Sequence, residues 1–381
     1  MENLARFRSV GELEASGFFM RNREAILTFL RTPQVSACAG SIPRLGDFLR
    51  VAQWNIEKGK RLDPIAECFG GHAILQWADI IILNEADCGM SRSGNRHVAA
   101  ELAGRLGMHM VFAPAHFELT DGSGDDLPVA GENRESLQGN AILSRHPVRE
   151  ASVVALPVTF EPYEFGEKRF GRRSCLWARV EWRRSRLWVG SVHLELRNTP
   201  SCRARQVEHI MKNLPGGGGD AYLLGGDLNT NGFSRGTLWR TVRSAARLLC
   251  LPAGRIRAEL LSPDRGREPL FEVAGRHGFF WDALNTNEET ARTAIDDLEE
   301  SDALPGFLLG GIRRRLRPYG GYLSFKLDWL LGRRLKALAA MERCDARTGV
   351  MSVGPGRVPG INHGPGRMSD HLPVYADLAL E

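Results

Sequence analysis

The chain has 381 residues, 43% of them hydrophobic and 25% charged, and its formal net charge is +5 at pH 7. This composition is typical of a globular protein with a sizeable core and argues against a disordered chain. No apolar run reaches the roughly 18 residues that span a bilayer, so we expect no stable membrane insertion. The N-terminus lacks the pattern of a secretory signal, and we expect a cytoplasmic protein. The positive charge suits an anionic partner such as nucleic acid but names no substrate.

Seven cysteines are scattered along the chain without any CxxC pair. An odd number without close pairs argues against a disulfide framework. We expect reduced thiols, most of them buried.

Residues 1–45 are predicted to form a helical N-terminal extension. Apolar residues between Phe18 and Leu30 recur with near-helical spacing, and Pro33 and Pro43 then interrupt the pattern. We expect this extension to dock on the main domain, which is predicted to span residues 46–381.

The main domain alternates between short apolar runs typical of strands and segments with helical spacing. The alternation is not regular enough for a doubly wound parallel sheet, so a two-sheet sandwich flanked by helices fits better. The expected strands are Leu49 to Ile56, Asp79 to Leu83, Ala141 to Leu143, Leu176 to Val180, Leu187 to Val192 and Tyr222 to Leu224, and the expected helices include His97 to Leu106 and Arg203 to Leu214.

Two stretches are predicted to be insertions into this domain. Residues 120–137 are polar and rich in Gly and Asp, and residues 251–321 contain an acidic segment followed by the basic run from Arg313 to Arg317. Such loops carry specificity or have no function of their own.

Polar residues able to bind a metal follow the apolar strands at six separate places. Strand ends that meet at one sheet edge are a common way to build a site. Taken singly, Asn55 is more often a turn residue and Glu85 more often a solvated strand end. Asp227 and Asn229 are stronger candidates, since glycines before them permit close backbone approach, although an Asx turn explains them equally well. The adjacent Asp370 and His371 offer a metal ligand and a base that titrates near neutrality.

These residues also lie in short motifs whose order resembles the endonuclease/exonuclease/phosphatase superfamily. The motifs are Trp54-Asn55, Leu83-Asn84-Glu85, Gly139 to Ser144, His193-Leu194, Gly226 to Asn229, Lys326 to Trp329 and Ser369-Asp370-His371. Each motif is permissive alone, but seven in the right order are specific. One departure is Asn84, where the family more often has Gln. The resemblance runs from about residue 49 to 378 and implies a four-layered α/β/β/α sandwich with two mixed sheets.

The resemblance also implies a divalent-metal-dependent hydrolase of phosphate esters. It implies that Asn55, Glu85 and Asp370 bind Mg²⁺ or Mn²⁺, which prefer hard oxygen ligands. It implies that His371, oriented by Asp328, draws a proton from water, although Asp227 competes for this role. His193 and Asn229 would contact the phosphoryl group. Asn140 and Arg203 are expected to bind substrate.

The substrate is left open by the motifs. His193-Leu194 followed by a helix with Arg203 and Gln206 resembles the deoxyribonuclease I, sphingomyelinase and deadenylase branches more than the abasic-site endonucleases. We expect a phosphodiesterase or nuclease, with a sphingomyelinase-like or inositol-phosphate phosphoesterase as the alternative. The basic segments Arg169 to Arg173 and Arg313 to Arg317, each with an aromatic residue (Phe170, Tyr319) that could stack on a base, favour nucleic acid. A solvated basic face is the alternative for both segments. Apolar Pro305 to Leu309 favours a lipid ester. An inactive module that binds phosphorylated ligands or proteins is a third possibility.

Overall fold

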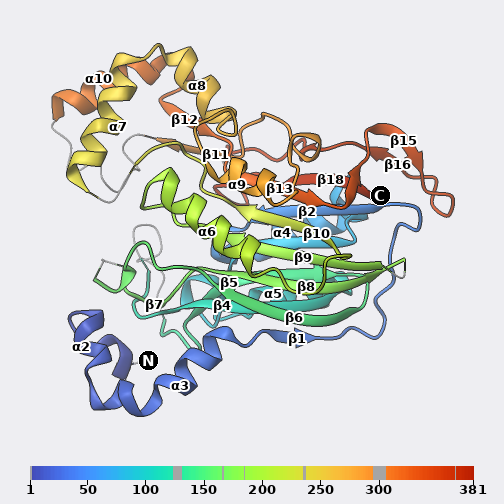
Figure 1. Ribbon diagram of the computed structural model, residues 1–381, viewed down its shortest axis with the longest axis horizontal. Coiled ribbons are helices and arrows are strands. Elements are labelled where there is room, and N and C mark those ends of the chain that lie inside the picture. Colours follow the sequence, from blue (N-terminus) through green and yellow to red (C-terminus); the bar gives the residue numbers. More distant parts are fainter. Residues whose placement is uncertain are drawn as a thin grey trace.

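The computed structural model of the protein describes residues 2–122, 131–164, 167–183, 185–234, 237–294, 306–364 and 366–381. Two large mixed sheets pack face to face, and helices cover both outer surfaces (Figure 1). This arrangement confirms the four-layered sandwich predicted from the sequence. Parts of both expected insertions, residues 123–130 and 295–305, lie outside the described residues.

The larger sheet has the strand order β1-β4-β5-β3-β2-β18-β14, with β7 paired to β4 and β17 paired to β18. Strands β2 and β3 are parallel, whereas β18 and β5 flank them in antiparallel pairs. The strands are β1 (Gln34–Ser36), β2 (Leu49–Asn55), β3 (Ile80–Cys88), β4 (His109–Glu118), β5 (Leu137–Ser144), β7 (Arg169–Gly171), β14 (Leu335–Ala337), β17 (Gly356–Arg357) and β18 (Val374–Leu380).

The smaller sheet has the order β13-β10-β9-β8-β6, in which β10 and β9 are parallel. Two small two-stranded sheets, β11 with β12 and β15 with β16, are separate from both large sheets. These strands are β6 (Val148–Ala155), β8 (Ser174–Trp182), β9 (Ser185–His193), β10 (Ala221–Asp227), β11 (Ala291–Ala294), β12 (Tyr322–Phe325), β13 (Asp328–Arg333), β15 (Ala340–Cys344) and β16 (Met351–Val353).

The helices form outer layers because each buries one apolar face against a sheet. Helices α4 and α5 cover the larger sheet, and α6 and α9 cover the smaller one. The helices are α1 (Glu2–Ala5), α2 (Val10–Glu14), α3 (Gly17–Arg31), α4 (Leu62–Gly71), α5 (Val98–Leu106), α6 (Pro200–Lys212), α7 (Leu238–Cys250), α8 (Ala253–Leu261), α9 (Leu270–Arg276) and α10 (Gly306–Leu316).

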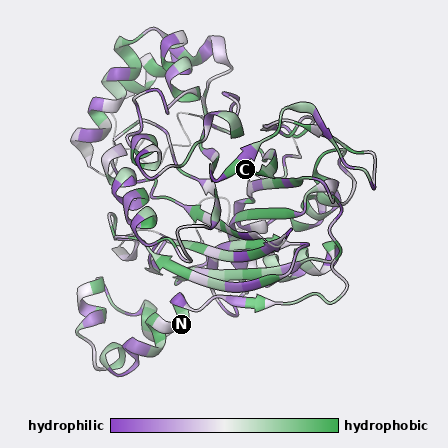
Figure 2. Cartoon of the chain, turned by 45° about the vertical axis from the view of Figure 1, so that its right-hand side comes forward, coloured by the Kyte–Doolittle hydropathy of each residue, from purple (hydrophilic) through white to green (hydrophobic). Residues whose placement is uncertain are grey.

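Side chains of the central strands alternate between the outer and the inter-sheet layers, as the two-residue period of a strand requires. In β2, Ala52 and Trp54 pack under α4, whereas Leu49 and Val51 face the second sheet. Figure 2 colours the strands by hydropathy and shows green, hydrophobic stretches interrupted by purple, hydrophilic ones.

The inter-sheet layer changes from apolar to polar along its length. In β9, Leu187 and Val189 are followed on the same face by Ser191 and His193. In β10, Ala221 and Leu223 are followed by Gly225 and Asp227. The same change along β2 and β3 brings polar side chains together at one end of the sandwich, and this end holds the candidate site.

The N-terminal extension and the helices of the second insertion lie on opposite sides of the sandwich (Figures 1 and 2). The extension contains α1 to α3 as predicted, together with β1, which was not predicted. The insertion was predicted to begin at residue 251. In the structure its helices begin with α7 at Leu238, and α9 packs on α6 in the outer layer of the main domain. The apolar residues of α9 complete the core behind the smaller sheet, which explains why this helix belongs to the main domain.

All seven cysteines are free thiols, which agrees with the prediction of reduced cysteines. Burial was overestimated, because only Cys88, Cys175 and Cys202 are buried, and Cys250 and Cys344 are exposed. No helix in the described part of the chain is both long and apolar enough to cross a bilayer.

Candidate active site

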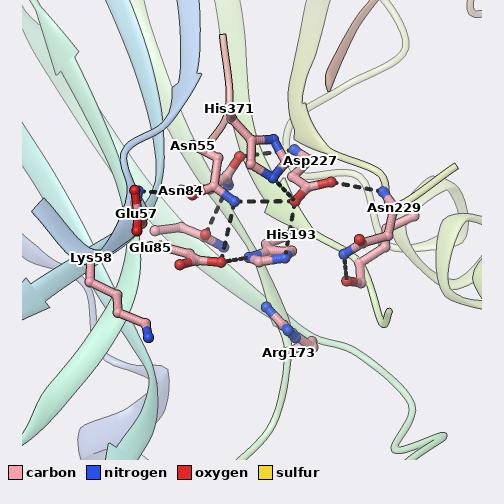
Figure 3. A network of polar contacts seen from close by, with 12 residues as sticks. Asn55, Glu57, Lys58, Asn84, Glu85, Arg173, His193, Asp227, Asn229 and His371 are labelled. Carbon is pink, nitrogen blue, oxygen red and sulfur yellow. Dashed lines mark hydrogen bonds and ion pairs between the residues drawn. The ribbon is translucent and has the colours of Figure 1, made fainter. Parts of the chain in front are cut away.

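One carboxylate oxygen, Asp227 Oδ2, lies at the centre of the polar cluster (Figure 3). The Asn55 amide nitrogen donates a hydrogen bond to it at 3.1 Å. His193 Nε2 lies 3.3 Å and His371 Nε2 lies 3.7 Å from the same oxygen. Asn55, His193 and Asp227 end strands β2, β9 and β10, and these strand ends meet as predicted. His371 lies in the segment before β18, and Asp328 is the first residue of β13, so these two residues do not follow a strand as was expected.

Gly226 allows Asp227 to reach this position. Its φ of +155° falls in a region that side chains rarely adopt, and a Cβ atom there would lie 1.8 Å from the Val192 carbonyl oxygen. Only glycine fits so close to the neighbouring strand. The pairing of β10 with β9 then sets Asp227 directly opposite His193.

His371 is held by Asp328. Its Nδ1 lies 2.8 Å from Asp328 Oδ2, and Asp328 Oδ1 accepts a hydrogen bond from the Gln53 amide at 3.0 Å. The Trp54 indole donates to the His371 carbonyl oxygen at 2.9 Å. Asp328 is fully buried, so both the ring orientation and the side of the ring that faces Asp227 are fixed.

Glu85 and Asp370 form the acidic side of the cluster. Glu85 Oε1 accepts a hydrogen bond from Asn55 at 3.2 Å and lies 3.9 Å from His193 Nδ1. Glu85 has a left-handed backbone with φ of +56°, at the register shift between β3 and β5. Such strain in a residue other than glycine is common at functional sites.

Glu57 supports Asp370 and was missed in the sequence, where only Asn55 of this loop was singled out. It lies in the single-turn 3₁₀ segment Glu57–Gly59, and Glu57 and Lys58 both have positive φ. Glu57 Oε2 accepts the Asp370 backbone N–H at 3.0 Å, and its other oxygen lies 2.8 Å from the Lys60 ammonium. The carboxylates of Glu57, Glu85 and Asp370 therefore gather on one side of Asn55.

The protonation of the cluster follows from burial and charge. Burial raises the pKa of Asp227 to about 7, although the charge of His371 opposes the rise. Burial alone would lower the pKa of His371, but the carboxylates of Asp328 and Asp227 hold it well above its usual value. Burial lowers the pKa of His193 well below 6.5, and the charge of Arg173 adds to this. His193 is thus neutral, while Asp227 and His371 titrate as a coupled pair.

Asn229 and Asn84 hold the loops of the site. The Asn229 backbone N–H donates to Asp227 Oδ1 at 2.9 Å, and its amide donates to the Leu194 carbonyl at 2.8 Å. Asn84 accepts the Asp227 backbone N–H at 2.9 Å and donates to the Val192 carbonyl at 3.0 Å. Asn84 therefore joins the two sheets directly beneath the site, a role that its position in the sequence does not reveal.

Asn140 and Arg203 were expected to bind substrate, and both form hydrogen bonds with other residues of the protein. Asn140 is buried, accepts a hydrogen bond from Asn84 at 2.9 Å and donates to the Ser174 carbonyl at 3.1 Å. Arg203 is fully buried in α6, and its Nε donates to Glu268 at 3.1 Å. The structure gives both residues internal partners, and their contact with substrate stays an untested prediction.

Arg173 does approach the site. Its guanidinium faces His193 in Figure 3, and the ion pair with Glu195 is long at 4.0 Å. Two expectations for this basic segment were wrong. Phe170 is only 7% exposed and cannot stack on a base, and Arg169 is not part of a solvated face because it forms ion pairs with Glu118 and Glu167.

The sequence model of the Endonuclease/Exonuclease/phosphatase family matches residues 52–371. The chain belongs to this family. The match covers every candidate site residue from Asn55 to His371 and leaves out the N-terminal extension, as the motifs indicated. The family name denotes enzymes that hydrolyse phosphate esters. No curated protein matches the chain in sequence.

Solved structures share this fold at low sequence identity. An endonuclease/exonuclease/phosphatase from Beutenbergia cavernae is 18% identical, with a TM-score of 0.50 over 88% of this chain and 72% of that one. A family protein from Leptotrichia buccalis is 12% identical, with a TM-score of 0.47 over 87% and 99%. The human Nocturnin catalytic domain with a bound sulfate anion is 14% identical, with a TM-score of 0.44 over 92% and 97%. At these identities the likeness concerns the fold alone.

Proposed function

We propose that the protein is a divalent-metal-dependent phosphodiesterase or nuclease that activates water for attack on phosphorus. The observation that carries the proposal is the geometry around Asp227 Oδ2, which faces Asn55, His193 and His371 within 3.7 Å. The carboxylates of Glu85 and Asp370 lie beside this cluster. Metal-assisted hydrolysis of a phosphate ester requires a group that accepts a proton, a neutral hydrogen-bond donor and carboxylates for the metal. The cluster and the carboxylates beside it contain side chains of each kind.

The residues present fit a hard divalent cation. Burial raises the pKa of Asp370, and the charges of Glu85 and Glu57 raise it further, although His371 opposes them. Mutual repulsion of carboxylates is what a bound cation would relieve. Among the described residues no group of three or more His, Cys, Asp or Glu side chains is placed to hold a metal ion by itself, so a cation here would have an open site with few protein ligands. Mg²⁺ and Mn²⁺ suit such an open site, because Mg²⁺ usually keeps several waters and binds one or two carboxylates.

Glu85, Asp370 and Asn55 are the residues that would hold the cation, which would neutralise charge on the phosphoryl and leaving oxygens. Asn55 now turns its amide nitrogen toward Glu85 and Asp227, while its oxygen accepts the Glu57 N–H at 3.2 Å. Binding through the oxygen requires a half-turn of this amide. The half-turn gives up the hydrogen bond from the Glu57 N–H and places the amide oxygen beside the carboxylates, an arrangement that a bound cation would favour.

Asp227 and His371 act in this proposal as one proton-accepting pair. Asp328 fixes the imidazole, and the pair would take the proton of the water that attacks the phosphorus. Neutral His193 donates to a non-bridging phosphoryl oxygen, and Arg173 behind it offers a positive charge to the same group. Asn229 keeps Asp227 in place through its backbone N–H. Each of these roles can be tested by substituting the residue concerned.

Hydrolysis of bis(p-nitrophenyl) phosphate tests the proposal. The purified chain should release p-nitrophenol with Mg²⁺ or Mn²⁺ and lose this activity in excess EDTA. A panel of single- and double-stranded DNA, RNA, sphingomyelin and inositol phosphates then separates the nuclease from the lipid and small-molecule alternatives. Full turnover in EDTA would refute metal dependence, and no hydrolysis of any ester with either metal would favour a non-catalytic binding protein.

A further inference from the structure

Strand β7 lies between the N-terminal extension and the candidate active site. It has three residues and pairs with β4 through Phe170 opposite Phe117 and Arg169 opposite Glu118. A strand of three residues with a single neighbour is weak on its own. Its position therefore depends on what packs against its two faces.

One face of β7 belongs to the extension. Phe170 is buried, and its ring lies 5.5 Å from that of Phe19 in an edge-to-face contact. Leu4, Leu13 and Leu30 of the extension complete the same apolar cluster. Because side chains alternate along a strand, Arg169 points the opposite way, and it lies 2.9 Å from Glu118 and 2.6 Å from Glu167.

The segment leading into β7 is tied to the extension by hydrogen bonds as well. The Lys168 ammonium donates to the carbonyl oxygens of Ala5 at 2.8 Å and Phe7 at 2.6 Å. The Tyr163 hydroxyl donates to the Leu4 carbonyl oxygen. Three carbonyls of the extension thus accept from side chains of this segment, which fixes its distance from the first helices.

The other end of β7 leads directly to Arg173. The Arg172 N–H donates to the Ala115 carbonyl at 3.0 Å, and the Arg173 carbonyl accepts the Leu156 N–H at 2.9 Å. Gly171 has a φ of +140°, and a Cβ atom there would lie 2.3 Å from the Ala115 oxygen. The chain between Phe170 and Arg173 is therefore short and held to β4, so a shift of β7 moves the Arg173 backbone.

We propose that the N-terminal extension is a brace that positions Arg173 beside His193 for contact with the substrate phosphoryl group. Phe19, Tyr163, Lys168 and Phe170 are its positioning residues, and none of them touches the reacting atoms. The inference rests on the proposed function, since it assigns Arg173 to the same phosphate ester. It gives a role to residues that the family model does not cover.

Phe19→Ala tests the brace in the full-length protein. It removes the ring that packs on Phe170 and leaves every residue of the active site unchanged. KM for bis(p-nitrophenyl) phosphate with Mg²⁺ should rise about tenfold, as when one charge-assisted hydrogen bond is removed, with kcat nearly unchanged. Phe19→Leu should restore most of the affinity. The matched control is Phe279→Ala, a buried ring behind the smaller sheet that packs near Tyr222 and should not alter KM.

A double-mutant cycle separates positioning from general destabilisation. Arg173→Gln should raise KM by a similar factor, and Phe19→Ala should add little in the Arg173→Gln background, because the brace would have no guanidinium left to position. If the increases of KM in the two single variants multiply in the double variant, the proposal is wrong. An equal rise of KM in Phe279→Ala would overturn it as well.

Failure of the proposed function is distinguishable from failure of the brace. If the wild-type chain hydrolyses no phosphate ester, the activity assignment fails, and amide hydrogen exchange tests the brace independently. The Leu119 N–H donates to Lys168 and the Arg172 N–H to Ala115, so both amides should exchange faster in Phe19→Ala and not in Phe279→Ala. Unchanged exchange at both amides in Phe19→Ala would exclude the brace whatever the activity.

Discussion

Asp227 shares one buried carboxylate oxygen among three side chains from separate parts of the chain. Inside a protein such interactions are stronger than in water, and the groups titrate together. Burial raises the pKa of Asp227 against the opposing charge of His371, whereas the carboxylates of Asp328 and Asp227 raise the pKa of His371 against the opposing effect of burial. The pair can therefore hold or release one proton near neutral pH, which neither a solvated Asp nor an isolated His would do in the same way.

His371 and Asp328 should behave as one unit when they are removed. His371→Ala and Asp328→Ala are each expected to lower kcat by about 10²- to 10³-fold, within the range of general acid–base catalysis. The double variant should be little worse than His371→Ala, because Asp328 then has no imidazole to orient. The cycle is measured with bis(p-nitrophenyl) phosphate, and effects that multiply would show that the two residues act independently.

Glu85→Gln should weaken the dependence on metal. The substitution keeps the size of the side chain and an acceptor for the Asn55 amide but removes the charge that a divalent cation prefers. The Mn²⁺ concentration for half-maximal activity should rise at least about tenfold, since even indirect partners of a metal are worth about 10- to 100-fold. Glu150→Gln on the outer strand β6, where Glu150 pairs with Arg179, is the control. An unchanged Mn²⁺ titration would remove Glu85 from the metal site.

The sequence identified the residue types of the site but not which of them face it. Asn55 and Asp227 were predictable because each ends an apolar strand within a recognisable motif, whereas His371, which precedes β18, was predictable from its motif alone. Asn140 belongs to such a motif too, yet its side chain forms hydrogen bonds with the Asn84 amide and the Ser174 carbonyl oxygen. Arg173 was visible only as one of several arginines. Whether such a side chain faces the site depends on hydrogen-bond partners that are distant in the sequence. A single sequence does not show which distant residues come together.

At the scale of elements, the predicted strands correspond to β2, β3, β5, β8, β9 and β10, generally with longer bounds in the structure. Strand β4 was not predicted. It contains Pro114, and its register with β5 shifts between Pro114 and His116. Proline in a strand is confined to edges and bulges, so it argues against a strand in a sequence pattern. Here the bulge, which only the pairing with β5 reveals, accommodates it.

The β15–β16 hairpin offers a test of pH-dependent stability. Asp345 accepts hydrogen bonds from the backbone N–H of Asp47 and Gly46 and from Thr348. Burial would raise the pKa of Asp345, but these bonds outweigh it and lower the pKa to about 2. A lowered pKa stabilises the fold above the unfolded value of 3.8, and this stabilisation disappears as the pH falls towards 2.

Asp345→Asn should therefore lower the free energy of unfolding by about 2 kcal/mol at pH 7, the size that such a pKa difference implies. The difference from wild type should shrink steadily as the pH falls below the unfolded pKa. Urea unfolding in neutral and in acidic buffer measures it. A difference of the same size in both buffers would mean that altered packing, and not the carboxylate charge, causes the destabilisation.

At the scale of the whole molecule, two peripheral units flank a family fold. The extension packs on β4 and β7 through an apolar cluster, whereas the insertion presents charge and aromatic surface. Helices α7 and α10 contain six arginines and no acidic residue. Trp239 on α7 and Phe307 on α10 are 76% and 78% exposed. Exposed aromatic rings near cationic side chains favour a single-stranded nucleic acid, whose bases stack and whose phosphates attract arginine.

Charge reversal in the insertion should then weaken binding of nucleic acid without affecting hydrolysis of a small ester. Arg314 and Arg317 are exposed and make no ion pair with the described residues. Arg314→Glu with Arg317→Glu should lower the affinity for single-stranded DNA and flatten its salt dependence, by about 0.7 in the log–log slope for each phosphate that the protein no longer neutralises. Arg21→Glu with Arg23→Glu, on α3 across the sandwich, reverses the same charge and is the control. Fluorescence anisotropy across a salt series gives both quantities.

Equal weakening of DNA binding in the two double variants would indicate a non-specific effect of net charge. Unchanged DNA affinity in Arg314→Glu with Arg317→Glu would direct the search to lipid and small phosphate esters.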